Sequence, residues 1–150
     1  MDRLDRAILS HLQDDGRLSN VELAERVNLS PSATLRRVRN LEASGAITGY
    51  HAVIDPKAVG RAYEVTVHAT LLLRNRETIE AFEAALVPLE EVIEARRMFG
   101  EPDYLIRVAV ADADAYEQFL INTFADLPGL ARMTSQFTMK TLKPGGRLPL

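Results

Sequence analysis

The sequence predicts an α+β protein of two domains, an N-terminal helix-turn-helix domain and a C-terminal ferredoxin-like βαββαβ domain. Two observations predict this fold class. Residues 19–45 hold two apolar patterns of helical period separated by a short turn. Residues 62–143 show strand and helix patterns in the order strand, helix, strand, strand, helix, strand. With 150 residues, of which 47% are hydrophobic, the chain is long enough for two small cores.

The first helix is predicted from about residue 4 to residue 13. Its apolar side chains recur at the spacing that lines one helix face, and they are Leu4, Ala7, Ile8 and Leu12. The sequence Asp-Asp-Gly at residues 14–16 ends it. This helix supplies the third element that a helix-turn-helix needs, because two helices alone do not enclose a core.

A second helix is predicted to begin at Ser19. Glu22 follows three residues later, and the pair forms the pattern of a capping box. The side chains expected on the buried side are Leu23, Ala24 and Val27. Asn28 should end the helix, because asparagine tolerates the left-handed conformation that a tight turn between helices requires.

A third helix should follow directly, with Ser30 as its N-cap and Pro31 at its first position. Leu35, Val38 and Leu41 recur at helical spacing and are expected to face the core. Gly45 supplies the stop. The short turn and the two caps together favour a helix-turn-helix over two unrelated helices.

The outward face of the third helix carries groups that a DNA major groove can bind. Arginine pairs bidentately with guanine, asparagine pairs with adenine, and serine bonds base edges or phosphates. The predicted DNA-binding residues are Ser30, Ser32, Ala33, Thr34, Arg36, Arg37, Arg39 and Asn40. Ser32, Ala33 and Arg36 should lie nearest the bases, and Arg37, Arg39 and Asn40 at the phosphates. The alternative is an ordinary solvated helix face.

The charge distribution is compatible with a DNA partner although the net charge is −3. Residues 1–50 hold seven basic and seven acidic side chains, and three of the basic ones lie within residues 36–39. The local sign of charge matters more than the total. The chain has no cysteine, no apolar run of membrane-spanning length and a charged N-terminus unlike a signal peptide. We therefore expect a cytoplasmic protein with no membrane partner.

Residues 51–61 are predicted to be an extended hinge between domain 1–50 and domain 62–143. Tyr50 to Ile54 has an extended pattern, and residues 55–60 have the composition of a turn. Such a hinge either pairs with the same segment of a second chain or is a plain connector. The sequence leaves both alternatives open.

The second half has a regular order of elements. From residue 63 to residue 73 apolar side chains alternate with polar ones, which predicts a strand with one buried face. The elements expected next are a helix at 77–86, strands at 92–99 and 104–110, a helix at 112–127, and a strand at 130–142. Residues 144–150 should form a tail. This order is the ferredoxin-like arrangement.

Catalytic patterns are missing from the sequence. It has no metal-ligand spacing, no glycine-rich phosphate loop, no nucleophile with an adjacent base, and no paired carboxylates in a recognisable pocket. We therefore predict a protein that is not an enzyme and that needs no metal or cofactor.

Two motifs, in order and at the right separation, resemble the Lrp/AsnC family of transcriptional regulators. The first is LDRAILSHLQDDGRLSNVELAERVNLSPSATLRRVRNLEASGAITGY with the Asp-Pro turn that follows it. The second is GEPDYL at residues 100–105, which resembles the family's glycine-acid-aromatic-aspartate loop. The resemblance covers almost the whole chain. Pro102 departs from it, since the family usually has an aromatic or other apolar residue there.

The resemblance implies a winged-helix-like DNA-binding domain joined to a ferredoxin-like sensing domain. Such proteins form homodimers that assemble into tetramers or octamers, and small effectors, commonly amino acids, bind between dimers. Carried over by position, the effector-binding residues are Gly100, Glu101, Pro102, Asp103 and Tyr104, with Thr134, Ser135 and Gln136 of the last strand. The alternative is that residues 100–103 form only a turn between strands.

These observations together predict a sequence-specific regulator of transcription that binds double-stranded DNA and responds to an amino acid or related metabolite. Two alternatives stay open. One is a nucleoid-organising protein of the same fold without a specific effector. The other is a small metabolic ligand-binding module, which would leave residues 19–45 without a role.

Overall fold

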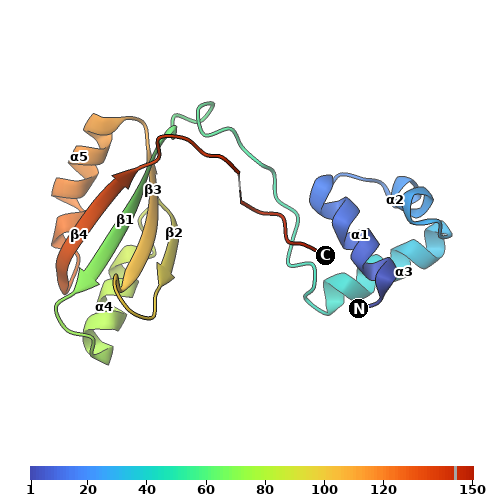
Figure 1. Ribbon diagram of the computed structural model, residues 1–150, viewed down its shortest axis with the longest axis horizontal. Helices are drawn as coiled ribbons and strands as arrows, with labels where there is room; N and C mark the ends of the chain where they lie inside the picture. The colour runs from blue at the N-terminus through green and yellow to red at the C-terminus, as the bar shows by residue number, and fades with distance from the viewer. Residues whose placement is uncertain (144) are drawn as a thin grey trace. The chain divides into compact units, whose positions relative to one another are not determined.

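The computed structural model describes residues 1–143 and 145–150, and these form two compact units (Figure 1). Met1–Val53 and Lys143–Leu150 make up the first unit, which we call the helical domain. Ile54–Leu142 makes up the second, which we call the sheet domain. Each of the two units has its own cluster of buried apolar side chains.

The helical domain consists of three helices, α1 (Arg3–Asp14), α2 (Asn20–Val27) and α3 (Pro31–Ala43). Their inner faces meet in one small core. The buried members of this core are Ile8, Leu23, Val27 and Leu41, and partly buried side chains such as Leu12, Leu29 and Val38 surround them. The predicted helix-turn-helix is confirmed.

The predicted caps of α2 and α3 are present. The Glu22 amide donates to Ser19 Oγ at 3.2 Å, and the Ser19 amide donates to Glu22 Oε2 at 2.8 Å. Asn28 ends α2 with φ of 54° and ψ of 47°, the left-handed conformation expected of it. Ser30 Oγ accepts the Ala33 amide at the start of α3. Local side-chain chemistry therefore fixes both ends of the turn.

The buried face of α3 differs from the prediction at one position. Thr34 has no exposed surface, whereas Leu35 is 38% exposed. The buried side is therefore built on residues 34, 38 and 41, spaced four and three apart, rather than on residues 35, 38 and 41. Thr34 is tolerated there because its hydroxyl donates to the carbonyl of Ser30 at 3.1 Å.

The sheet domain is a four-stranded antiparallel sheet with two helices, and its order of elements confirms the predicted βαββαβ arrangement. The elements are β1 (Tyr63–Leu71), α4 (Arg76–Leu86), β2 (Val92–Arg97), β3 (Tyr104–Val110), α5 (Ala113–Asn122), a 3-10 turn η1 (Phe124–Asp126) and β4 (Leu130–Phe137). The strand order is β2-β3-β1-β4, with β1 paired to both β3 and β4 (Figure 1).

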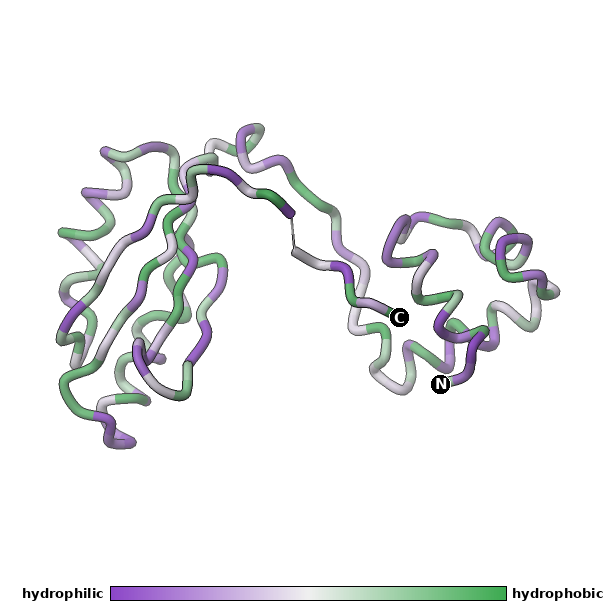
Figure 2. The backbone as a smooth tube through the Cα atoms, viewed as in Figure 1, coloured by the Kyte–Doolittle hydropathy of each residue, from purple (hydrophilic) through white to green (hydrophobic). Residues whose placement is uncertain are grey.

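One face of the sheet carries the core. Side chains of α4, α5 and η1 pack there on alternate residues of β1 and β3. The largest fully buried side chains of this domain are Phe82, Phe124, Leu86, Ile106, Val65, Val67 and Val108. Figure 2 shows apolar and polar positions alternating along the strands, as the period of two requires. The other face is polar and partly exposed. On it Arg107 of β3 binds Glu64 of β1 and Glu94 of β2.

Four elements of the sheet domain end earlier than predicted. β1 ends at Leu71, β2 at Arg97, α5 at Asn122 and β4 at Phe137, against predicted ends of 73, 99, 127 and 142. The helix after Asp112 stops because Thr123 leaves helical geometry, and the 3-10 turn that follows buries Phe124. Within the described part of the chain, no helix combines the length and apolarity needed to cross a membrane.

Candidate functional site

The outward face of α3 displays most of the predicted DNA-binding residues. Ser32, Arg36, Arg39 and Asn40 are exposed, and Ala33 is half-buried. Among residues 1–143 and 145–150, no carboxylate forms an ion pair with Arg36 or Arg39. Their guanidinium groups therefore keep their donors for a partner with acceptors in a fixed arrangement, such as guanine or phosphate.

Thr34 and Ser30 lie at the start of α3 but differ in access. Thr34 is fully buried beneath the helix and cannot reach a base, so the prediction that it binds DNA is wrong. Ser30 is exposed, yet its hydroxyl already accepts the Ala33 amide and lies 3.2 Å from Ser32 Oγ. A serine hydroxyl has one donor, so Ser30 can donate to a phosphate when Ser32 is the donor in the contact between the two serines.

Arg37, predicted to bind phosphate, is held inside the protein instead. Its Nη1 donates to Asp5 Oδ1 at 2.7 Å and to Asp2 Oδ2 at 2.8 Å, and its side chain is only 27% exposed. The hydrogen bonds that Arg37 donates to Asp5 and Asp2 raise the pKa of Arg37. Two carboxylates of the described residues therefore already compensate the charge of Arg37.

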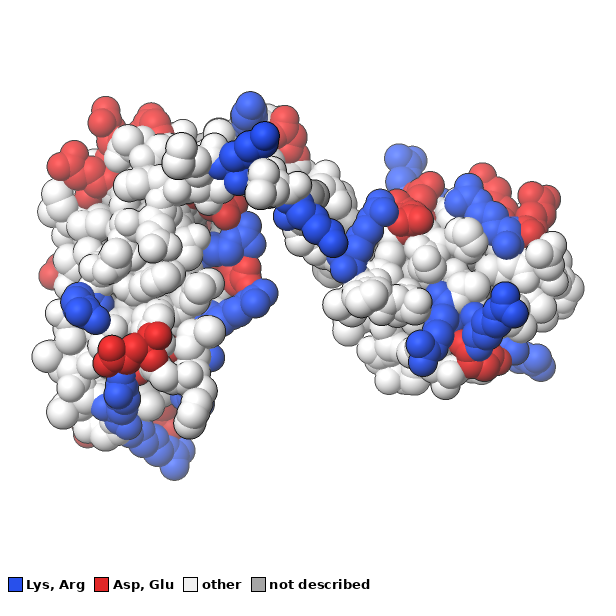
Figure 3. Space-filling model, viewed as in Figure 1, with Lys and Arg blue, Asp and Glu red and all other residues white. Residues whose placement is uncertain are grey.

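Acidic side chains accompany the basic ones over the helical domain. In Figure 3, Asp and Glu lie between Lys and Arg on the face shown, and there is no continuous basic surface. On this face, therefore, positive charge is not gathered into one broad patch.

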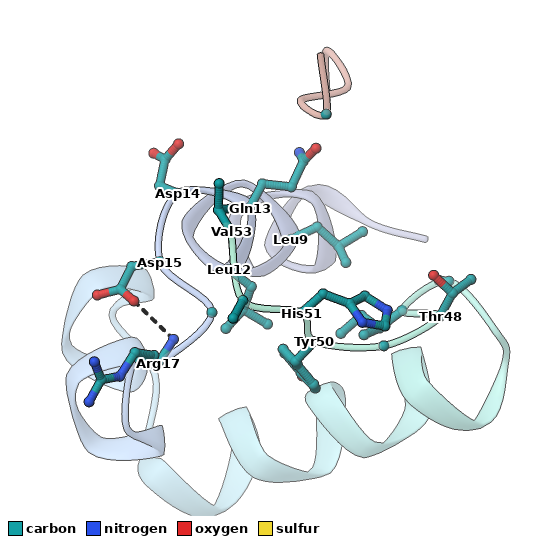
Figure 4. A pocket seen from close by; sticks show the side chains of 16 residues that line it. Leu9, Leu12, Gln13, Asp14, Asp15, Arg17, Thr48, Tyr50, His51 and Val53 are labelled. Atoms are coloured by element: carbon teal, nitrogen blue, oxygen red, sulfur yellow. Dashed lines mark hydrogen bonds between the residues drawn. The ribbon is translucent and has the colours of Figure 1, made fainter. Parts of the chain in front are cut away.

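The helical domain also contains an open groove of about 830 Å³ (Figure 4). Leu9 and Leu12 of α1 form one wall, and the chain from Ala46 to Val53 forms the other. The charged residues that line it are Asp14, Asp15 and Arg17, and the Arg17 amide donates to Asp15. None of the predicted DNA-binding or effector-binding residues lines this groove. This groove is therefore not the predicted effector site.

In the sheet domain, the loop between β2 and β3 brings the predicted acidic residues around Arg74. Asp103 Oδ1 accepts from Arg74 Nε at 2.6 Å, and Glu101 Oε1 lies 3.4 Å from Arg74 Nη2. These contacts, Asp103 first, raise the pKa of Arg74. Gly100 has φ of +119°, a conformation that favours glycine. Arg74 had no predicted role, since it lies 29 residues before Asp103.

Asp103 is largely buried, and its other oxygen accepts the buried amide of Leu71 at 2.8 Å. Both carboxylate oxygens therefore have partners within the protein. Asp103 holds the end of β1 to the start of β3, and it is not a free anion for an ammonium group. Glu101 is the exposed carboxylate of the loop, with 67% of its side chain accessible.

A cavity of about 180 Å³ lies beside this loop. Its walls combine apolar side chains with two arginines, and they are Leu71, Arg74, Ile79, Arg97, Met98, Asp103 and Tyr104. Tyr104 donates to Glu83 Oε1 at 2.9 Å, and burial together with this bond raises the pKa of Tyr104 to about 12. The tyrosine therefore stays neutral near pH 7. The cavity suits a compact molecule with an anionic group and an apolar part.

The three predicted companions on β4 do not join this loop within one protomer. β1 lies between β3 and β4 in the sheet. Thr134 and Gln136 are exposed on the polar face, paired with His68 and Thr66. Ser135 points to the helix side, where its hydroxyl lies 2.6 Å from Tyr116 Oη. Thus Thr134 and Gln136 share a face, and Ser135 does not. In the described residues no group of three His, Cys, Asp or Glu side chains is placed to hold a metal ion.

Family models match both domains. The model described as winged helix-turn-helix DNA-binding matches residues 1–48. The model described as Lrp/AsnC ligand binding domain matches residues 64–148. These matches cover the two domains whose geometry is given above.

Relatives are similar over nearly the whole chain. The leucine-responsive regulatory protein of Salmonella typhimurium is 42% identical over 99% of this chain and 90% of its own length. That of Escherichia coli K12 is 41% identical with the same coverage.

Solved structures are also similar to this chain over nearly its whole length. A transcriptional regulator of Neisseria meningitidis in complex with L-Met has a TM-score of 0.94 at 34% identity, covering 99% of this chain and 96% of that one. An AsnC family transcriptional regulator of Agrobacterium tumefaciens has a TM-score of 0.93 at 36% identity, covering 99% and 97%. With a winged helix-turn-helix DNA-binding domain and a ligand binding domain that both match, this chain belongs to the Lrp/AsnC family of transcriptional regulators.

Proposed function

We propose that α3 reads specific DNA sequences through Ser32, Ala33 and Arg36, while Arg39, Asn40 and Ser30 bind phosphates. The observation that carries this proposal is the exposure of Arg36 and Arg39, which have no acidic partner among the described residues. In this proposal residues 1–50 bind DNA, residues 62–143 bind a ligand, and residues 51–61 connect them. We propose that the protein is cytoplasmic, because its proposed partner is DNA.

Arg36 and Arg39 provide a matched test of base reading. Duplexes are selected from a random library with the wild-type protein, and binding is measured by fluorescence anisotropy over a salt series, with unselected duplex as competitor. Arg36→Ala should cost about 1 to 3 kcal/mol on selected DNA and much less on unselected DNA. Arg39→Ala should weaken both alike and lower the salt slope by about 0.9.

Equal losses from both variants on both kinds of DNA would contradict base reading by Arg36. If the wild-type protein binds selected and unselected duplexes equally, it is an architectural DNA-binding protein of this fold.

We further propose that the ligand is an amino acid with an apolar side chain, bound at the cavity beside the β2–β3 loop. Arg74, 56% exposed, offers its remaining donors to the ligand's carboxylate. In this proposal Glu101, whose Oε1 lies 3.4 Å from Arg74 Nη2, receives the ammonium group, and Leu71, Ile79 and Met98 supply the apolar wall. The L-Met complex of the Neisseria regulator supports this ligand class.

Arg76 offers a control for Arg74. Its side chain is 89% exposed and binds Glu80 on α4, away from the cavity-lining set. Ligand binding is measured by calorimetry with each of the common L-amino acids. The Arg74→Gln variant should lose roughly tenfold or more in affinity, as expected for a lost charge-assisted hydrogen bond, and Arg76→Gln should be unchanged. Equal affinity for the two variants would move the carboxylate site elsewhere.

We propose that the protein forms homodimers that assemble into tetramers or octamers. Four large apolar side chains at the cavity end of the sheet support assembly, since they are exposed in one protomer. They are Leu72, Leu73, Met98 and Phe99, and Phe99 is fully exposed. Residues 47–54, which include the start of the 51–61 hinge, form no strand within the protomer, and Val53 and Ile54 are exposed there. Both observations support pairing of this segment with the same segment of a second chain.

A ligand at this end would change the assembly only by binding one oligomer more tightly than another. Sedimentation velocity with and without the amino acid that calorimetry identifies tests this mechanism. A single protomer-sized species under both conditions would contradict it.

A further inference from the structure

The N-terminus of α1 and the side of α3 are joined through three charged side chains. Asp2 and Asp5 form a capping box on α1, in which Asp2 Oδ1 accepts the Asp5 amide and Asp5 Oδ2 accepts the Asp2 amide, both at 2.9 Å. The second oxygen of each carboxylate accepts from Arg37 Nη1. All four carboxylate oxygens are therefore used, two to cap α1 and two to hold α3.

Arg37 occupies a side of α3 between its buried and its outward face. Val38, the residue after Arg37, lies on the buried side of the helix, and Arg36, the residue before Arg37, lies on the outward side. No backbone ladder joins one helix to another as it joins strands, so the rotation of α3 about its axis depends on its side-chain contacts and on the short turn from α2. The core contributes Thr34, Val38 and Leu41, and the link to Asp2 and Asp5 adds a polar contact at the flank.

We propose that Asp2, Asp5 and Arg37 form a clamp that positions α3 for base reading, and that Arg37 is a positioning residue and not a DNA ligand. The inference rests on the proposed function of α3. The clamp has two effects. It fixes the direction in which Arg36 leaves the helix, which matters because bidentate pairing with guanine has a strict geometry.

The second effect is electrostatic. Two carboxylates face one guanidinium, so the clamp carries a net negative charge beside the DNA-binding helix. This charge opposes binding driven by phosphates alone, which is independent of sequence. Because phosphates are the same on all DNA, this charge lowers affinity for selected and unselected duplexes alike, and the ratio of the two depends on how the clamp orients Arg36.

The test compares Arg37→Gln and Asp5→Asn with the control Arg39→Gln in the full-length protein, on selected and unselected duplexes over a salt series. Arg37→Gln should lower the ratio of selected to unselected affinity about three- to tenfold while leaving the salt slope unchanged. Arg39→Gln should lower the slope by about 0.9, as expected for one phosphate contact, and leave the ratio unchanged.

Asp5→Asn is the milder variant, because asparagine keeps one of the two acceptor oxygens. It should raise affinity for unselected DNA about twofold and lower the selected-to-unselected ratio. Circular dichroism at the assay temperature establishes that each variant is folded. A merely structural role would reduce the folded fraction and scale both affinities equally, without changing the ratio or the slope.

Two results overturn the clamp. One is a lower salt slope with an unchanged ratio for Arg37→Gln, which would make Arg37 a phosphate ligand. The other is an equal rise in both affinities for Asp5→Asn. In either case Arg39→Gln still lowers the slope and the proposed function survives. If Arg36→Ala and Arg39→Gln both leave binding unchanged, α3 does not face DNA and both proposals fail.

Discussion

The two domains keep their elements in place by different means. In the sheet domain, β1 is hydrogen-bonded to β3 and β4 along most of its length, so the backbone itself fixes the register of the strands. In the helical domain the three helices meet only through side chains around Ile8, Leu23 and Leu41. A single substitution in the helical domain therefore acts on the relative position of whole elements, whereas one in the sheet acts locally.

Two arginines illustrate this difference. Arg37 and Arg107 each bind two carboxylates. Arg107 links strands that the backbone already holds in register, at Thr66 on one side and Glu94 on the other. Arg37 links two helices that have no such support. Similar ion pairs thus carry different structural weight, and the surroundings decide which one positions an element.

The largest expected effect is on the cores. Ile8→Ala and Ile106→Ala each remove a fully buried side chain and should cost about 2 to 5 kcal/mol in their own domain. A domain the size of residues 1–53 has roughly 3 to 8 kcal/mol of stability, so Ile8→Ala should leave much of it unfolded. The larger sheet domain should stay folded with Ile106→Ala. NMR amide spectra, which report each domain separately, check this, and a folded helical domain in Ile8→Ala would contradict it.

An intermediate effect is expected at Asp103. Asp103→Ala leaves the buried Leu71 amide without an acceptor and should destabilise the sheet domain by about 1 to 3 kcal/mol. Asp103→Asn keeps an acceptor oxygen and should cost less, while weakening the hold on Arg74. Urea unfolding followed by the sheet-domain signals measures both. Equal losses for the two variants would show that charge, and not the hydrogen bond to Leu71, is what Asp103 supplies.

The smallest effect is on acid stability. The hydrogen bond from the Asp5 amide and the contact with Arg37 lower the pKa of Asp2 below its ordinary value of 3.8. Its stabilising contribution is therefore complete above about pH 4 and is lost as the pH falls through the lower value of the folded state. In the sheet domain Arg107 likewise lowers the pKa of Glu94.

Paired variants separate the two contributions. Asp2→Asn should flatten the acid dependence of the helical domain alone, and Glu94→Gln that of the sheet domain alone. Thermal unfolding followed by NMR tests both variants between about pH 2 and pH 6, the range over which carboxylates titrate. A change in the untouched domain would contradict the independence of the two units.

What the sequence predicts well is local. Ser19, Asn28 and Ser30 could be assigned because caps and turns depend on neighbours within four residues. The alternation of β1 and the order of the elements follow from short periods, and they predict the confirmed fold. The buried face of α3 was misjudged because Leu35 and Thr34 both fit a helical spacing, and packing against α1 and α2 selects the less apolar one.

What the sequence does not show is which distant groups meet. Arg37 binds residues 32 and 35 positions away, and Asp103 binds Leu71 across 32 positions. In the sequence, Arg37 on a predicted outward helix face and Asp103 in a loop that contains a glycine are both of the residue types that bind ligands. Only the fold reveals that each already has partners within the protein.

The link between α1 and α3 has a consequence for how relatives of this chain diverge. Residues 2 and 5 lie 35 and 32 positions before residue 37, and they are not part of the helix-turn-helix. Because Arg37 without its carboxylates, or either carboxylate without Arg37, leaves an uncompensated charge at the flank of α3, substitutions at these positions should occur together in an alignment. Positions 36 and 39 should vary independently of them, following the DNA sequence that each regulator recognises.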